Sequence, residues 1–210
     1  AARGVPIGVD CVSPARHSAF GTPLEMVRFI AQLRELSGGK PVGFKLCIGH
    51  PWEFMAICKA MLETGIRADF IVIDGTEGGT GAAPLEFVDH VGTPLREGLA
   101  FAHNCLVGAG LRSSIRLGAA GRIVTAFDMA RVLALGELIG AAGLAHPNEL
   151  RRVHIQKRVS PSEVKSFAEL FPALRPGELL TGCSDAHYAR FWAMADASSF
   201  DAADPQRSAA

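Results

Sequence analysis

Short apolar runs and longer amphipathic stretches alternate along residues 5–136 of the chain. The apolar runs carry β-branched residues between polar turns and predict strands at 5–12, 41–48, 70–74 and 115–118. The amphipathic stretches predict helices at 22–36, 50–64, 93–108 and 125–135. Alternating strands and helices with short connections are typical of parallel βα units, so we expect an α/β fold.

The four units fit either an open doubly wound sheet or an arc of a (β/α)8 TIM barrel. A complete barrel typically needs about 250 residues, so this chain would form at most a partial barrel. In both arrangements ligands bind at the carboxyl ends of the parallel strands. The candidate site residues are therefore those that lie where the predicted strands end.

The pattern changes after residue 136, where residues 137–143 continue as helix with no β-rich run between them and the helix before. Ser160, with Glu163 three residues later, matches a capping box and predicts a helix over about 162–170. The last residues are rich in Ala, Ser and Asp, which is typical of a frayed end. We expect three parts: a partial barrel over 1–136, a helical extension over 137–185 and a flexible tail over 186–210.

A glycine-rich loop follows the apolar run at 70–73, which predicts a strand buried on both faces. Asp74 and Glu77 precede this loop and are candidates for binding substrate, although Asp before Gly also forms turns. The loop lacks the P-loop lysine and does not match G-x-G-x-x-G, so a phosphate, a carboxylate or a flavin edge would each fit it. Its small residues permit close approach of main-chain N–H groups, and they are Gly78, Gly79, Thr80 and Gly81.

Lys45 interrupts the apolar run at 41–48, where burial of a charged side chain is costly unless it meets an anion. It either reaches solvent from an edge strand or faces the site beside a carboxylate substrate or an electron-rich cofactor ring. Arg16 follows the first predicted strand and could bind a carboxylate through two hydrogen bonds. A solvated loop, where such residues usually lie, is the favoured alternative for Arg16.

The composition narrows the class of protein. The chain has 210 residues, 49% of them hydrophobic, which suits one globular domain. Its formal net charge is zero, so there is no electrostatic reason to expect nucleic acid or a membrane as a partner. Neither a membrane-spanning apolar run nor a signal peptide is expected. The five cysteines form no C-x-x-C pair, so we expect buried, reduced thiols and a cytoplasmic location. The histidines lack metal-ligand spacing, and no metal site is expected.

Four stretches resemble the FMN-binding domain of the glutamate synthase-like family: PVGFKLCIGHPWEF, DFIVIDGTEGGTGAAPLEF, TPLREGL and IRLGAAGRI. The resemblance covers residues 3–136 and implies a (β/α)8 barrel that carries FMN. It implies that ammonia from a glutaminase domain meets 2-oxoglutarate, and that the resulting 2-iminoglutarate takes a hydride from reduced FMN to become glutamate. The partners implied are therefore 2-oxoglutarate, ammonia, and a glutaminase or electron-donor subunit. A homo-oligomer is also compatible with the resemblance.

The resemblance also assigns residues. Lys45 matches the family's strand lysine near flavin and 2-oxoglutarate, which makes it the candidate catalytic residue and a cofactor contact. The 78–81 loop matches the glycine loop on the substrate side of the flavin. Gly121 is the one residue retained where the family has Asp-Gly-Gly at the FMN phosphate.

The chain also departs from the family pattern. The early barrel strands are not in the sequence, and a block that follows the helix ending near residue 136 is missing, whereas the part from about residue 141 again resembles a later family segment. Cys183 alone cannot replace the family's cysteine-rich segment, so no iron–sulfur cluster is expected. An oxidoreductase of the glutamate synthase type is the first hypothesis, and a non-catalytic remnant or interaction module without flavin is the second. A TIM-barrel enzyme that uses Lys45 as a Schiff-base amine ranks third.

Overall fold

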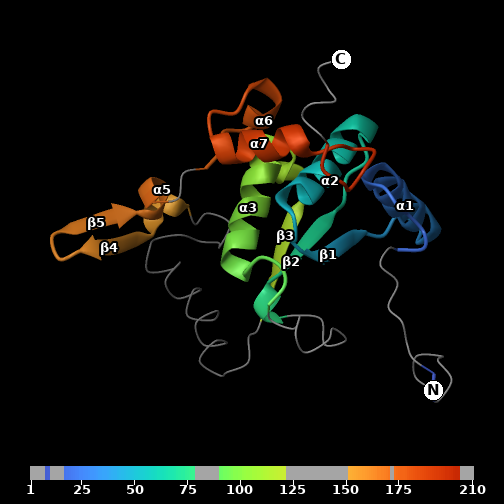
Figure 1. The fold of residues 1–210 in the computed structure, drawn as a ribbon, viewed down its shortest axis with the longest axis horizontal. Helices are drawn as coiled ribbons and strands as arrows, with labels where there is room; N and C mark the ends of the chain where they lie inside the picture. Colours follow the sequence, from blue (N-terminus) through green and yellow to red (C-terminus); the bar gives the residue numbers. More distant parts are fainter. Residues whose placement is uncertain (1–7, 10–16, 79–89, 122–150, 171–172, 204–210) are drawn as a thin grey trace.

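A three-stranded parallel sheet lies at the centre of the computed structural model, which describes residues 8–9, 17–78, 90–121, 151–170 and 173–203 (Figure 1). The strand order is β1-β2-β3, with β1 at Gly43–Cys47, β2 at Phe70–Asp74 and β3 at Arg116–Ala120. The parallel α/β prediction is confirmed. The arrangement is consistent with an arc of a barrel, although the strands of the described residues do not close into one.

Three helices follow the predicted boundaries closely: α1 at Pro23–Leu36, α2 at Pro51–Thr64 and α3 at Leu95–Gly108. Helix α1 begins with a complete capping box, in which Thr22 Oγ1 accepts from the Glu25 N–H and the Glu25 carboxylate accepts from the Thr22 N–H. Helix α2 ends at Gly65, whose φ of 70° is the left-handed conformation that glycine adopts at no steric cost. Local signals thus set the start of α1 and the end of α2.

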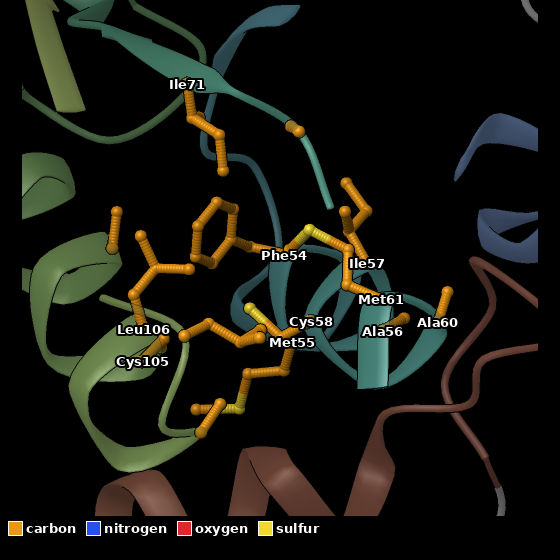
Figure 2. Packing of buried hydrophobic residues seen from close by; sticks show 14 of the residues in the cluster. Phe54, Met55, Ala56, Ile57, Cys58, Ala60, Met61, Ile71, Cys105 and Leu106 are labelled. Carbon is orange, nitrogen blue, oxygen red and sulfur yellow. The ribbon is translucent and has the colours of Figure 1, made fainter. Parts of the chain in front are cut away.

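The helices cover one face of the sheet, and the core lies between the helices and this face. Ile71 and Ile73 of β2 are fully buried on this face. Figure 2 shows Phe54 of α2 lying between Ile71 and Leu106 of α3. Phe54 and Leu106 are at most 1% exposed, so this junction joins the sheet to both helices through apolar contact.

The opposite face of the sheet is more open, and the expectation that β2 is buried on both faces is wrong. Phe70 is 37% exposed and Val72 is only partly buried. Among the described residues, the helices lie on one side of the sheet (Figure 1). A strand covered on one face alternates between buried and accessible residues, as β2 does.

The C-terminal third differs from the predicted helix over 162–170. An antiparallel hairpin occupies this region, with β4 at Gln156–Ser160 and β5 at Glu163–Ser166, and a single helical turn, α5, at Phe167–Leu170. Pro161 and Ser162 form the turn, so the Ser160 and Glu163 pair is not a helix cap. The working capping pair lies further along, where Ser166 and Glu169 exchange hydrogen bonds at the start of α5.

The expected flexible tail from residue 186 instead begins with helix α7 at Ala186–Met194, which follows α6 at Glu178–Thr181. The Asn104 amide of α3 donates to the Tyr188 hydroxyl at 2.9 Å. Lys59 Nζ donates to the Ala195 carbonyl at 2.8 Å, and the Leu24 N–H donates to the Ala197 carbonyl. Residues 186–197 are therefore part of the folded body, because their aromatic and main-chain groups pack on α2 and α3.

Of the strand predicted at 5–12, only Gly8 and Val9 are described, and they lie in a turn and a bend. The helix predicted at 125–135 lies outside the described residues.

Short 3-10 helices are present at Thr76–Gly78 (η1), Arg112–Ser114 (η2) and Arg152–His154 (η4). In the part of the chain that the structure describes, no helix is long and apolar enough to cross a membrane.

Candidate functional site

Lys45 lies on the open face of the sheet, near its carboxyl edge. In the strand register, Lys45 stands opposite Val72, and Val72 stands opposite Gly118. The next row on the same face consists of Cys47, Asp74 and Ala120. The Lys45 side chain reaches this next row, because its Nζ lies 2.7 Å from Asp74 Oδ2.

Lys45 fulfils both interpretations of its sequence position, because it reaches solvent and also meets an anion. Its side chain is 58% exposed, as expected of a lysine that reaches solvent from an edge strand, and its ammonium also meets a carboxylate. The Asp74 side chain is only 19% exposed. Asp74 is the last residue of β2 rather than a turn residue, and Lys45 is the partner of its carboxylate.

Glu77 lies in η1, directly after β2, and it contacts helix α3. Both carboxylate oxygens of Glu77 accept from the Leu95 N–H, each at 3.1 Å. The helix predicted from residue 93 begins at Leu95, where the N-cap residue is Pro94 and no side chain caps the helix from that position. The Glu77 carboxylate takes over this role, and its negative charge also favours the positive end of the helix dipole.

The segment that leads into the glycine loop is held against the segment before α3. The Thr76 N–H donates to the Thr93 carbonyl at 3.2 Å, and the Thr76 hydroxyl donates to the Val91 carbonyl at 2.8 Å. A Cβ atom at Gly75 would overlap the Glu77 carboxylate. Glycine is therefore required at this position if Glu77 is to fold back onto α3.

Gly121 contacts the same helix start. The strand predicted to end at residue 118 continues through Ala119 and Ala120 in β3, so the connection begins only at Gly121. A Cβ atom at Gly121 would lie 2.7 Å from Leu95 Cδ2. The absence of a side chain here lets the end of β3 approach α3.

The structure thus brings together only some of the predicted site residues. Lys45 and Asp74 meet directly, while Glu77 and Gly121 both contact Leu95 at the start of α3. Gly78 ends η1 and is the first residue of the predicted loop. Three residues of the loop, and the arginine predicted to bind a carboxylate, lie outside the described residues: Gly79, Thr80, Gly81 and Arg16.

Cys47 is a residue of this face that the sequence did not single out as a site residue. It was expected to be buried, but it is exposed because it lies on the open side of β1, in register with Asp74. Its thiol donates a weak hydrogen bond to the Thr93 carbonyl at 3.8 Å. Partial burial, followed by the charges of Asp74 and Glu77, raises the pKa of the Cys47 thiol, which is therefore protonated at neutral pH.

An apolar groove of about 500 Å³ runs beside Lys45, along the edge of β1 that no strand of the described residues pairs with. Helices α1 and α2 form its walls, with aromatic side chains from several elements: Phe20, Phe29, Phe44, Phe54 and Phe200. Among all the residues that the structure describes, no group of three or more His, Cys, Asp or Glu side chains could hold a metal ion. The Cys183 thiol donates to the Asp185 carbonyl at 3.6 Å.

Comparisons with known proteins point to one family. A family model described as a conserved region in glutamate synthase matches residues 1–144. A glutamate synthase large subunit-like protein of Bacillus subtilis (strain 168) is 43% identical over 134 residues, which are 64% of this chain and 25% of that protein.

Two similar proteins are named as glutamate synthases that use NADPH. The archaeal-type glutamate synthase of Thermotoga neapolitana is 36% identical over 68% of this chain and 28% of its own length. The archaeal glutamate synthase of Methanocaldococcus jannaschii is 36% identical over 65% of this chain and 26% of its own length. The chain thus spans about a quarter of the length of the curated relatives it matches.

Proposed function

Because the chain belongs to the glutamate synthase family, we propose that it carries part of the active site of an FMN-dependent oxidoreductase that acts on CH–NH2 groups. The reaction proposed is the reductive amination of 2-oxoglutarate to glutamate, in which 2-iminoglutarate receives the hydride. Glutamate biosynthesis in the cytoplasm is the proposed context. The names of two relatives specify NADPH, which makes NADPH the first electron donor to test.

The observation that supports this proposal is the position of Lys45. A lysine on an accessible sheet face, at the carboxyl edge of parallel strands, is suited to bind an anionic ligand. Gly118 and Ala120, in the same two rows on β3, carry almost no side chain and leave room over the sheet. These features fit a flat ligand that lies across β1 to β3.

The described residues fit a flavin in part. Lys45 and the loop that begins at Gly78 would border it, whereas Gly121 supports the packing of β3 on α3. FMN, when bound, would supply the hydride. Lys45 would hold a carboxylate of the substrate and stabilise negative charge that develops beside it, which is how fixed cations assist such reactions.

The function can be tested by the absorbance of the purified chain before and after addition of FMN, together with the binding of 2-oxoglutarate measured by calorimetry. We expect flavin absorbance to remain with the protein after gel filtration. Lys45→Ala should weaken 2-oxoglutarate binding at least tenfold. Lys40→Ala, which removes an exposed lysine just before β1, is the matched control and should bind like the wild type.

A second candidate is a non-catalytic module of the same fold that no longer binds flavin. The contacts of Glu77 and Gly121 favour it, because the Glu77 carboxylate accepts from the Leu95 N–H of α3 and Gly121 lies against the Leu95 side chain. A chain that stays colourless with FMN and does not bind 2-oxoglutarate would support this candidate and contradict the first. Its partners, which could include a glutaminase or electron-donor subunit or a second copy of the chain, would then be sought by pull-down.

A further inference from the structure

We infer that the Lys45–Asp74 ion pair selects a ligand that carries a carboxylate next to a cationic nitrogen, and therefore favours an amino or imino acid over the corresponding oxo acid. This inference rests on the proposed function, because it assigns the ligand class of the same site. The carboxylate of such a ligand would face Lys45, and its ammonium or iminium N–H groups would face Asp74. An oxo acid offers the carboxylate alone.

The pair is built so that Asp74 is the fixed member. The Asp74 side chain is 19% exposed, against 58% for Lys45, and it extends from the central strand of the three. Lys45 starts one row away from Asp74 and bridges the gap with its long side chain, since its register partner is Val72. The carboxylate therefore determines where the ammonium lies.

The backbone after Asp74 is held in place as well. The Gly75 N–H donates to the Ala120 carbonyl at 3.0 Å, and the Thr76 N–H donates to the Thr93 carbonyl. The Glu77 carboxylate is bound to the start of α3. Because these contacts join the end of β2 to both β3 and α3, they hold in place the backbone from which the Asp74 side chain extends.

This rigidity has an electrostatic consequence. A lone carboxylate that binds Lys45 also comes close to Asp74, and the repulsion offsets part of the attraction. A ligand with adjacent opposite charges replaces one ion pair by two and suffers no such loss. The pair as a whole has no net charge, so it discriminates by the arrangement of charge on the ligand rather than by the ligand's total charge.

The test compares glutamate and 2-oxoglutarate binding to the complete chain with FMN added, in the wild type and in Asp74→Asn. Asparagine keeps the shape of the side chain and removes its charge. We expect 2-oxoglutarate to bind about fivefold more tightly to the variant and glutamate about fivefold more weakly, a size that allows for the solvent exposure of Lys45. Lys45→Gln should weaken both ligands. Glu35→Gln, an exposed charge on α1, is the matched control.

The opposite signs separate recognition from a structural role, since a loosened site would weaken both ligands together. Circular dichroism should first show that Asp74→Asn is folded, and Asp74→Ser serves if it is not. An unchanged ratio of the two affinities, or no binding of either ligand, would overturn the inference. Failure of FMN and 2-oxoglutarate to bind, with glutamate binding that still depends on Asp74, would refute the proposed function alone.

Discussion

The role of Glu77 gives the sharpest test of how the loop after β2 is held. The sequence made Glu77 a candidate substrate ligand, whereas the structure shows its carboxylate accepting from the Leu95 N–H at the start of α3. Glu77→Ala would remove the acceptor and the charge, and Glu77→Gln would keep an acceptor and lose the charge. The two variants therefore separate the capping contribution from the dipole contribution.

The magnitude follows from these two contributions. Loss of a helix cap costs about 1 kcal/mol, and loss of a negative charge near a helix N-terminus costs about 0.3–1 kcal/mol. We expect Glu77→Ala to lower the free energy of unfolding by about 1–2 kcal/mol and Glu77→Gln by less than about 1 kcal/mol. Both variants should keep 2-oxoglutarate affinity within about threefold of the wild type, a difference of less than 1 kcal/mol.

Urea unfolding followed by circular dichroism measures the stability, and calorimetry measures the binding. Glu97→Ala is the control for the charge alone, because Glu97 is an exposed acid in the first turn of the same helix, and its substitution should lower the free energy of unfolding by about 0.3–1 kcal/mol. Glu77→Ala with unchanged stability and strongly weakened 2-oxoglutarate binding would refute the capping role. That result would restore Glu77 as a substrate ligand.

Three further outcomes are expected. Gly121→Val should lower the free energy of unfolding by about 1–3 kcal/mol, because its Cβ would press on Leu95, and urea unfolding measures the loss. Hydrogen bonds, led by the one from the Arg175 N–H, lower the pKa of Glu178 to about 2. The stabilising contribution of Glu178 is therefore complete above the ordinary pKa of 4.5 and is lost as the pH falls toward 2. Glu178→Gln should remove that part of the pH dependence of the unfolding free energy. Cys47 should react with iodoacetamide slowly at pH 7 and faster as the pH rises, because its pKa is raised, and mass spectrometry follows the modification.

The parts of the fold that the sequence predicted well are those specified by neighbouring residues. Thr22 with Glu25 sets the start of α1, and Gly65 sets the end of α2, because capping acts within one helical turn. The hairpin at 156–166 was missed because the same stretch contains a pattern that usually marks the start of a helix. Ser160 and Glu163 have capping-box spacing, yet the chain turns between them and uses Ser166 with Glu169 instead.

Helix α7 was missed for a different reason. Its short, Ala-containing sequence has little tendency to form a helix alone, and the contacts that stabilise it come from distant parts of the chain. Tyr188 meets Asn104 of α3, and Lys59 of α2 binds the carbonyl of Ala195 at the helix end. Composition alone therefore could not distinguish this segment from a frayed tail.

The candidate site shows the same limit. Lys45 could be identified from sequence because a charge inside an apolar run is a local signal. Its partner could not, since Asp74 lies on another strand and pairs with Lys45 only through the parallel register of β1 and β2. A lysine considered alone suggests an anion site, whereas a lysine held by a fixed carboxylate suggests a site for a ligand with both charges. If the proposed ligand class is correct, the register of two strands, more than the identity of any single residue, determines which ligand this face recognises.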